Sequence, residues 1–420
     1  MSVRRRSSTV LAALATAVVL VAAGCGATES TSPSTPVGTT LDVAALLGPT
    51  NKATGTPIKV GFVYDGKTMG IDQTAVGTAF NATVSYVNEH LGGINGHPIE
   101  VVECTTNNTP SDATNCGVKA VNEGVAAVLV PTSAQDATIF DPVSSAGIPY
   151  VTYAAGGQGI MIKPGGFLLV NPTALLAGPA KIAKDNGVKK AGIILIDVPA
   201  STGPVTALAK PMYDKLGIGV DVVPISPQTA DMTPQIQQAI GGGAEQFSII
   251  GTDDFNTSAI KALKQLGFQG RIVMVTAPTK AMAETVPGGL DGITYVTSTT
   301  DDPSDVDVQR YQAVLQTYMP DTAPVAQSAW AYVTVLGFVD ALAGRPEATD
   351  AASIMQALGS MPEPLPVPLG AGLTYQCGAK PVALVPNVCT GNVLSTTLDE
   401  EGRGQGYSIL DVSGYLTVGG

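Results

Sequence analysis

The chain has 420 residues, with 22 Lys and Arg against 34 Asp and Glu and a formal net charge of −12 at pH 7. This acidic balance argues against nucleic-acid binding, which requires clustered basic residues, and against attraction of the folded body to anionic lipid. Only 13% of the residues are charged, while 48 are Gly and 30 are Pro, a composition that suits a compact exported protein with many short turns.

The first 25 residues have the organisation of an export signal. Residues 4–6 are three arginines, and residues 10–23 form an apolar run that is too short for a permanent membrane helix. Cys25 follows small residues, which resembles the lipobox of bacterial lipoproteins, although Ala22 stands where that motif more often has Leu. The resemblance implies cleavage after Gly24 and a lipid anchor on Cys25. The alternative is ordinary signal cleavage with an incidental thiol.

Residues 25–56 are rich in Ser, Thr, Pro and Gly, and we expect most of this segment to be a flexible tether. Only residues 41–47 offer apolar side chains for packing. The globular part is expected to begin near Ile58, and no later apolar stretch is long enough to span a membrane.

Four further cysteines, an even number on an exported chain, predict two disulfides. Of the three pairings, we expect Cys104–Cys116 and Cys377–Cys389, because each pair is close in sequence and bounds a polar or Pro-containing loop. Each closure should stabilise the fold by roughly 3 kcal/mol. A metal site is not expected, because no CxxC occurs and neither histidine has a cysteine at finger-like spacing.

From Ile58 onward, short β-rich runs alternate with longer amphipathic stretches, which predicts a βαβαβ start and parallel sheets covered by helices. In the first helix an apolar stripe runs from Phe80 to Leu91, and Gly92-Gly93 predict its end. The first strands are expected at residues 58–64, 99–104 and 126–130, and the first helices at 77–91 and 112–123.

The alternation continues to about residue 300 and predicts two α/β lobes. Further strands are expected at residues 150–153, 167–170, 191–196, 220–225, 247–250, 271–275 and 293–296. Further helices are expected at residues 173–186, 204–215, 233–240 and 257–266. Helices at 305–318, 326–343 and 351–358 have too few strands after them for a third sheet, so we assign them to the first lobe. The lobes then comprise residues 57–171 plus 298–370 and residues 172–297 plus 371–420.

Residues 88–99, reading NEHLGGINGHPI, resemble the helix–turn–strand signature of type I periplasmic binding proteins of the branched-chain amino acid and amide class. The resemblance continues through residues 125–153 and 247–267 and spans about 57–418 in all. It implies two doubly wound parallel-sheet lobes joined by three crossovers, hinge closure on a small ligand, and delivery of that ligand to the permease of an ABC importer. We expect a monomer without a cofactor.

Thr132 and Ser133 follow a predicted strand and precede a predicted helix at 134–145, where unpaired N–H groups favour an anion. Ser133 is therefore a candidate for binding a ligand carboxylate, and a role as helix N-cap is equally open. The next strand end offers Ala154 and Gly156, where the backbone can approach a ligand closely, or it forms a plain Gly-rich turn. The family usually has a hydroxyl residue where Gly156 stands.

The first loop contributes Asp65, Lys67, Met69 and Asp72 as candidates that either line the same cleft or form an exposed loop. Together with the strand ends, they complete the predicted ligand-binding groups of the first lobe.

In the second lobe, the chain departs from the amino-acid binders that it resembles. Residues 276–279 stand where a glutamate commonly holds the ligand ammonium, and residues 198–202 lack the usual aromatic side chain. The pair Asp253-Asp254 can replace the missing negative charge, although such a pair before a helix more often caps it. Thr202, Asp253 and Ala277 complete the candidate ligand-binding set.

The sequence has no GxSxG, HExxH or P-loop motif, and its acids lack a fixed spacing, so we expect no enzyme. A carboxylate hydrolase stays open as a weaker alternative. We predict a lipid-anchored extracytoplasmic protein that captures a small polar ligand, such as an amino acid or amide, between its lobes for an ABC importer. Contacts to both lobes would favour the closed form. The alternative is a ligand-sensing or cell-wall-associated binding lipoprotein without a transport role.

Overall fold

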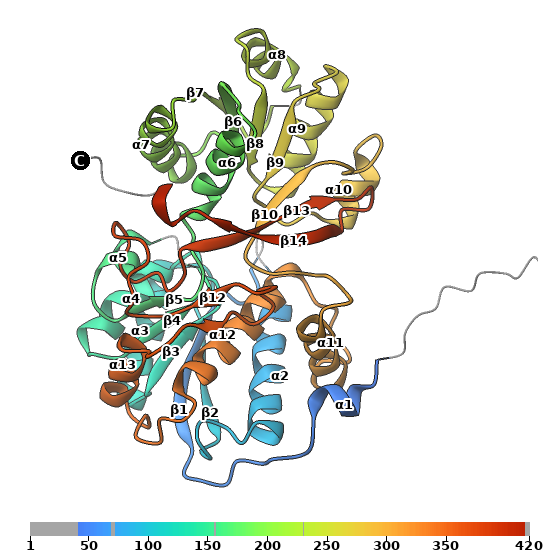
Figure 1. The fold of residues 1–420 in the computed structure, drawn as a ribbon. Coiled ribbons are helices and arrows are strands. Elements are labelled where there is room, and N and C mark those ends of the chain that lie inside the picture. Colours follow the sequence, from blue (N-terminus) through green and yellow to red (C-terminus); the bar gives the residue numbers. More distant parts are fainter. Residues whose placement is uncertain (1–40, 69–71, 155–156, 230, 416–420) are drawn as a thin grey trace, which may run out of the picture. The chain divides into compact units, whose positions relative to one another are not determined.

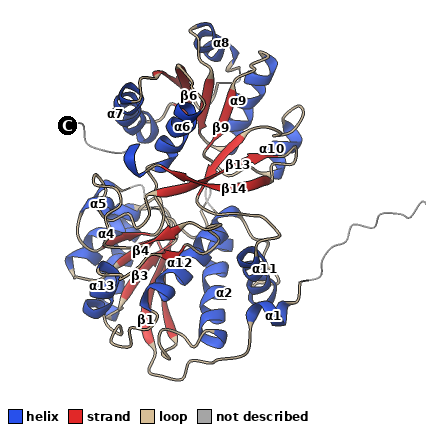
Figure 2. Ribbon diagram, viewed as in Figure 1, coloured by secondary structure: helices blue, strands red, loops and turns tan. Residues whose placement is uncertain are grey.

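The computed structural model describes residues 41–68, 72–154, 157–229 and 231–415. These residues form two α/β lobes, each built on one main sheet with helices against it (Figure 1). Strands and helices alternate along most of the chain, as Figure 2 shows by colour. The predicted fold class of two lobes with parallel sheets is therefore confirmed.

The first sheet has five parallel strands in the order β2-β1-β3-β4-β5. Its strands are β1 (Ile58–Tyr64), β2 (Ile99–Thr105), β3 (Ala127–Val130), β4 (Tyr150–Thr152) and β5 (Gly166–Leu168). β1 pairs with β2 along its full length and with β3 on its other side. Every residue of β3 is buried, which explains why this strand is a continuous apolar run.

Helices cover both faces of the first sheet. They are α2 (Thr74–His90), α3 (Pro110–Glu123), α4 (Asp136–Ser145), α5 (Gln158–Ile162), α11 (Val306–Tyr318), α12 (Ala326–Leu342) and α13 (Ala351–Gly359). On one face, the rings of Phe62 and Phe80 stack with centroids 3.8 Å apart, and α12 packs beside α2. On the other face, α3 packs against α4. The three late helices thus pack with the helices of the first sheet.

Local sequence explains where α3 begins and ends, and how the chain turns after α2. Thr109 caps α3 by accepting a hydrogen bond from the Asp112 N–H at 3.1 Å, and Gly124 ends the helix with φ of 63°. After α2, Gly93 adopts φ of 67°, and a Cβ there would lie 2.1 Å from the His97 carbonyl oxygen. Only glycine therefore fits the turn that follows α2.

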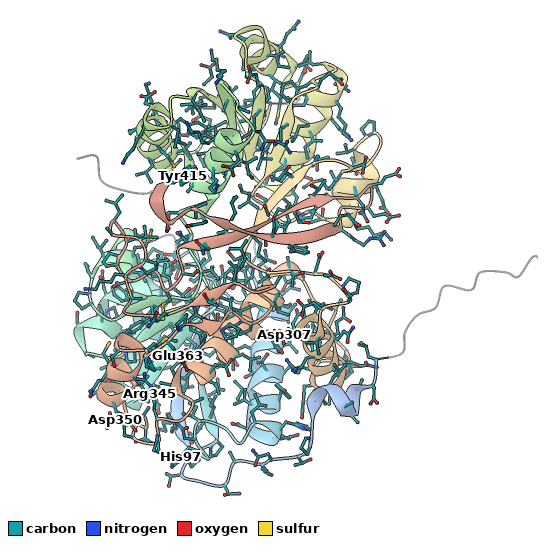
Figure 3. All side chains as sticks on the ribbon, in the orientation of Figure 1. His97, Asp307, Arg345, Asp350, Glu363 and Tyr415 are labelled. Carbon is teal, nitrogen blue, oxygen red and sulfur yellow. A yellow bond between two sulfur atoms is a disulfide. The ribbon has the colours of Figure 1, made fainter. Side chains whose placement is uncertain are left out.

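The expectation that residues up to 56 form a tether is wrong for residues 41–56. A short helix, α1 (Val43–Leu47), packs against α11, and Leu47 is buried. Both histidines of the chain hold this segment: His90 Nδ1 lies 3.0 Å from the Gly48 carbonyl oxygen, and His97 Nδ1 lies 2.8 Å from that of Thr56. Figure 3 labels His97 among the side chains of the first lobe. Residues 41–56 therefore pack as part of the first lobe.

The second sheet has seven strands in the order β14-β13-β10-β9-β8-β6-β7. They are β6 (Lys190–Ile196), β7 (Gly219–Ile225), β8 (Gln246–Ile250), β9 (Arg271–Met274), β10 (Thr294–Thr297), β13 (Asn392–Leu398) and β14 (Gly404–Asp411). The first five are parallel, whereas β13 and β14 form an antiparallel hairpin that the sequence did not predict. The helices are α6 (Ala174–Asp185), α7 (Pro199–Lys215), α8 (Thr233–Gly241), α9 (Asp253–Gln265) and α10 (Lys280–Thr285).

The chain passes between the sheets three times: between β5 and α6, between β10 and α11, and between α13 and β13. The third passage lies later than expected. The small pair β11 (Leu365–Pro366) and β12 (Thr374–Tyr375) stays with the first lobe, where Tyr375 Oη donates to the Gly337 carbonyl oxygen at 2.6 Å. The tail thus reaches the second sheet only at β13, and the expected return at residue 371 is corrected.

Both predicted disulfides are present. Cys104–Cys116 links β2 to α3, and Cys377–Cys389 closes the loop before β13. The second loop extends the first sheet, because the Cys389 N–H donates to the Leu168 carbonyl oxygen at 2.8 Å. Each bridge links residues 12 positions apart, and such closures stabilise by about 3 kcal/mol.

Tyrosine burial predicts that the fold is sensitive to alkaline pH. Burial is the largest cause that raises the pKa of eleven of the twelve tyrosines above the ordinary value near 10. The affected residues are Tyr64, Tyr86, Tyr150, Tyr153, Tyr213, Tyr295, Tyr311, Tyr318, Tyr332, Tyr375 and Tyr407.

We expect a spectrophotometric titration of the folded protein to show little tyrosinate at pH about 11, whereas the unfolded chain ionises near pH 10. A raised pKa in the folded state stabilises the fold below pH about 10, and this contribution is lost as pH rises through the folded pKa values. The free energy of unfolding should therefore fall steeply above pH about 10. Full ionisation near pH 10 in a protein whose circular dichroism is still native would contradict the burial described above.

Candidate functional site

The carboxyl ends of β1, β2 and β3 bring three polar side chains of the first lobe together. Asp65 follows β1 and is completely buried. Its Oδ1 accepts hydrogen bonds from Thr106 Oγ1 at 2.7 Å and from Ser133 Oγ at 2.6 Å. Its Oδ2 accepts from the Ala134 N–H at 2.8 Å. Two predicted site residues, Asp65 and Ser133, thus contact each other directly.

Ser133 also orders the turn before α4. Its Oγ accepts a hydrogen bond from the Gln135 N–H at 3.0 Å, two residues on, which is a serine turn rather than an N-cap of the helix. The helix begins at Asp136, two residues later than predicted. Thr132 and Ser133 are both half-buried. The hydroxyl of Ser133 is therefore engaged on both sides, as donor to Asp65 and as acceptor from the backbone.

An aromatic pair lies at the end of β4. The ring of Tyr153 stacks on the indole of Trp330 from α12, with centroids 5.1 Å apart and planes 8° apart. Burial raises the pKa of the Tyr153 hydroxyl, while hydrogen bonds with the side chains of Thr299 and Ser298 act in the opposite direction. Both hydroxyl partners belong to the segment that passes from β10 to α11. The stack therefore connects the edge of the first sheet to a crossing segment.

Ala154 is half-buried next to this pair, as expected for a residue at the strand end. Gly156 and Met69, which the sequence also singled out, lie outside the described residues, and so does Cys25. In the first loop, Lys67 Nζ lies 2.7 Å from Asp72 Oδ2, and both side chains are exposed. This ion pair and a bond from the Thr74 N–H lower the pKa of Asp72 to about 2. Lys67 and Asp72 thus match the alternative of an exposed loop.

On the second lobe, Thr202 lies in the first turn of α7. Its hydroxyl has two acceptors within reach for its one proton, Asp197 Oδ1 and the Val198 carbonyl oxygen, both at 3.0 Å. Ala277 is half-buried in the loop after β9. In the same loop, Thr279 caps α10 by accepting from the Met282 N–H at 3.2 Å, so the stretch that lacks a glutamate serves to begin a helix.

Asp253 and Asp254 begin α9 and are exposed. The N-cap itself is Thr252, whose hydroxyl accepts from the Phe255 N–H at 3.5 Å. Partial burial and the charge of Asp254 raise the pKa of Asp253. Acidic side chains in the first turn are stabilised by the positive end of a helix, so this pair matches the solvated alternative.

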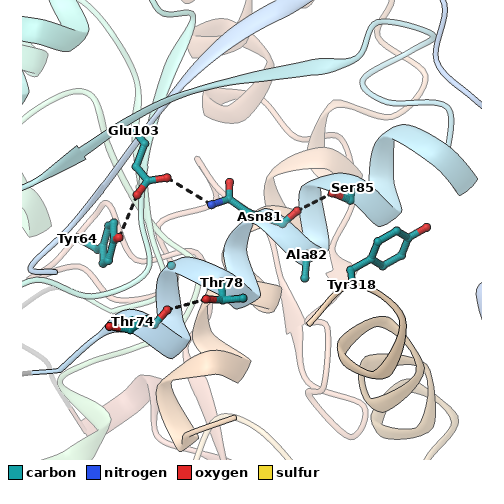
Figure 4. A pocket seen from close by; sticks show the side chains of 9 residues that line it. Tyr64, Thr74, Thr78, Asn81, Ala82, Ser85, Glu103 and Tyr318 are labelled. Atoms are coloured by element: carbon teal, nitrogen blue, oxygen red, sulfur yellow. Dashed lines mark hydrogen bonds between the residues drawn. The ribbon is translucent and has the colours of Figure 1, made fainter. Parts of the chain in front are cut away.

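A hollow of about 310 Å³ lies outside the predicted site, between α2, β2 and α11. Figure 4 shows the Glu103 carboxylate accepting from Tyr64 Oη at 2.9 Å and from Asn81 Nδ2 at 3.3 Å. Burial and this bond to Glu103 raise the pKa of Tyr64 to about 12. These polar groups satisfy one another, and none of the predicted ligand-binding residues lines the hollow.

Sequence reasoning missed two residues of the first-lobe site. Thr106 is a completely buried donor to Asp65, and it is hidden in the polar run that follows β2. Trp330 is the only tryptophan of the chain, and this rarity was the one available signal. Among the described residues, no group of three or more His, Cys, Asp or Glu side chains can hold a metal ion. No described helix has the length and apolar content needed to cross a membrane.

Comparisons with known proteins agree with the arrangement of sheets and crossings. A family model for periplasmic binding proteins matches residues 57–383. The leucine binding protein LivK from Thermotoga maritima is 16% identical with a TM-score of 0.63, and the match covers 84% of this chain and 97% of that chain. A search of curated proteins finds no match.

Two further solved structures carry ligands in their descriptions. LivJ from Streptococcus pneumoniae, a branched-chain amino acid transporter substrate binding protein in complex with isoleucine, is 16% identical with a TM-score of 0.63, covering 84% of this chain and 99% of that chain. A solute binding protein of an ABC transporter from R. palustris, in complex with 4-hydroxybenzoate, is 17% identical with a TM-score of 0.65, covering 84% and 97%. At these identities the likeness establishes the fold.

The Tyr153–Trp330 stack gives a spectroscopic prediction. We expect Tyr153→Leu to shift the fluorescence emission of Trp330 to the red and to lower the free energy of unfolding by about 1–3 kcal/mol, because the half-buried indole loses its stacking partner and a cavity forms. Trp330 is the sole tryptophan, so its emission reports this place alone. Tyr415→Phe is the matched control, since Tyr415 has no ring contact with Trp330. An unchanged emission spectrum in the Leu variant would disprove the described packing.

Proposed function

Because the chain belongs to the type I periplasmic binding protein family, we propose that it is a solute receptor that captures a small polar molecule between its lobes and delivers it to the permease of an ABC importer. The observation that carries this proposal is the aromatic pair Tyr153–Trp330 at the carboxyl edge of the first sheet, in which the Tyr153 ring is buried and the Trp330 indole is half-exposed. Open α/β sheets bind ligands at this edge.

The proposed site has an aromatic and a polar side. Trp330 offers an apolar face against which a solute can pack, and the adjacent strand end at Ala154 offers backbone groups for hydrogen bonds. The second lobe would add the start of α7 near Thr202 and the start of α9 near Asp253. A solute that contacts both lobes only when they close would stabilise the closed form by those added contacts.

Asp253 has the chemistry for a cationic part of the solute. Its pKa is already raised by partial burial and by Asp254, and closing would desolvate it further. An ammonium group at this place would compensate that cost, since a buried charge requires a partner. This supports a role for Asp253 in place of the glutamate that amino-acid binders of the family carry.

Native mass spectrometry of the purified protein should detect a retained small molecule, and small-angle scattering should show a smaller radius of gyration with solute bound. Saturation with that solute at about 100 times its Kd should stabilise the fold by about 2.7 kcal/mol in denaturant unfolding. Trp330→Leu should weaken binding at least about tenfold through lost packing, equivalent to about 1.4 kcal/mol, while Tyr415→Phe leaves it unchanged.

Two outcomes would count against this function. A solute that binds with equal affinity to the Trp330→Leu variant would place the site elsewhere. Solute binding without any stimulation of ATP hydrolysis by a reconstituted partner permease would favour a sensing or wall-associated binding lipoprotein.

We also propose that Cys25 carries a lipid that holds the protein at the outer face of the membrane. The basic start, the apolar run and the small residues before Cys25 support this. Wild-type protein expressed with its signal should partition with membranes and carry a diacylglyceryl group on Cys25 by mass spectrometry. Cys25→Ala should abolish the lipid and release the protein from the membrane fraction, because the acyl chains supply the anchoring free energy. Continued membrane association of the Ala variant would disprove the anchor.

A further inference from the structure

Asp65 is a completely buried carboxylate whose hydrogen-bond donors come from two loops, those after β2 and β3. Thr106 Oγ1, Ser133 Oγ and the Ala134 N–H all donate to it, at 2.6–2.8 Å. Its own N–H donates to Gln73 Oε1 at 2.9 Å, which fixes the backbone at this point. None of the ion pairs of the described residues includes Asp65, so hydrogen bonds alone compensate its charge.

These donors are the groups that an anionic solute would need. Ser133 Oγ and the Ala134 N–H lie just before α4, at the carboxyl end of β3, where a helix start and a strand end together favour negative charge. In this chain, both donors already point at the carboxylate of Asp65. A hydroxyl has one proton to donate, so Ser133 cannot serve Asp65 and a solute carboxylate at the same time.

We infer that Asp65 is a built-in carboxylate that fills the anion-binding groups of the first lobe, so that the receptor selects solutes presenting a neutral or cationic polar group there. The chemical class is that of amides, polyols and amines, in contrast to carboxylates held at Ser133. This inference about the solute rests on the proposed function, whereas the occupancy of the donors by Asp65 does not.

Electrostatics supports the selection. A solute carboxylate about 4 Å from Asp65 would meet a like charge, which at an effective dielectric constant of about 20 weakens binding by roughly three orders of magnitude. An uncharged amide or hydroxyl avoids this repulsion, and an ammonium group would be attracted. Asp65 therefore acts as a specificity-determining residue through its charge and through the donors it occupies.

The network also joins three loops, and this gives a competing explanation. Thr106 Oγ1 accepts from the Asn108 N–H at 3.1 Å, and Gln135 Nε2 donates to Asn108 Oδ1 at 3.2 Å, so the loops after β2 and β3 are tied together beside Asp65. A purely structural Asp65 would stabilise these loops without marking an anion site. The two explanations differ in what a free anion does when the side chain is removed.

The test is chemical rescue of Asp65→Ala with acetate, a free carboxylate that can occupy the vacated donors. We expect the variant to be destabilised and acetate to raise its thermal midpoint saturably by about 2–4 °C relative to chloride at equal ionic strength. Wild-type protein should show no such acetate-specific shift. Adding Ser133→Ala to Asp65→Ala should remove most of the rescue, because one donor is lost.

Two controls keep the result interpretable. Asp141→Ala removes an exposed carboxylate that pairs with Lys163, and it should give no acetate response. If Asp65→Ala does not fold in chloride, its refolding yield in acetate is measured instead, and recovery of native circular dichroism there supports the inference. An acetate response equal to that of chloride in both stability and refolding would overturn it.

The solute class has its own readout. The molecule retained by wild-type protein in native mass spectrometry should bind without a free carboxylate facing Ser133, so Ser133→Ala should change its affinity less than about threefold. A retained carboxylate whose affinity falls more than tenfold in Ser133→Ala would overturn the solute class. A third outcome is that acetate rescues Asp65→Ala but the wild-type protein retains no solute. Asp65 would then still be the occupant of an anion site, whereas the proposed receptor function would be contradicted.

Discussion

Parallel pairing of β1 with β2 and β3 is the constraint on which the chemistry of the first lobe depends. Because the three strands run the same way, their carboxyl ends share one edge, and the residues that follow them meet there. Asp65 therefore reaches Thr106, 41 residues away, and Ser133, 68 residues away, through hydrogen bonds shorter than 2.8 Å. In an antiparallel sheet, consecutive strand ends would alternate between edges and these groups would be separated.

The same edge carries two chemically different features. Asp65 and its donors form a closed polar cluster, whereas Trp330, stacked on the buried ring of Tyr153, presents a half-exposed aromatic surface. The first feature has its hydrogen bonds satisfied internally, and the second is bonded through Tyr153 to the segment that leaves β10. A solute at this edge would thus find packing surface at the aromatic pair and a fixed negative charge at Asp65.

Most of the sheet framework was predictable because parallel strands buried on both faces appear as continuous apolar runs. β1 and β3 are such runs, and their positions agree with the prediction to within one residue. The hairpin of β13 and β14 was not predicted, since β13 reads NVLSTTL and mixes polar with apolar side chains without the continuous apolar run of β3. The order of residues 41–56 was also hidden, because it depends on backbone and histidine bonds to residues distant in sequence.

The sequence indicated which loops carry the polar residues of the candidate site, but it did not show which of these residues contact one another. Strand-end reasoning located Asp65 and Ser133, yet no spacing rule shows that they bind each other across 68 residues. Trp330 lies in α12, whose sequence is apolar on nearly all faces of the helix. The sequence therefore does not show which face packs beside Tyr153, and this contact follows only from the tertiary packing.

The docking of α1 on α11 determines how a lipid on Cys25 would hold the molecule. Residues 26–40 lie between that cysteine and the first described residue, and a chain of this length can span at most about 60 Å at about 3.6 Å per residue. Because α1 packs on the first lobe, the proposed lipid on Cys25 would tether that lobe to the membrane. In the proposed lipid-anchored receptor, the second lobe would then be the one that moves relative to the anchor when the two lobes close.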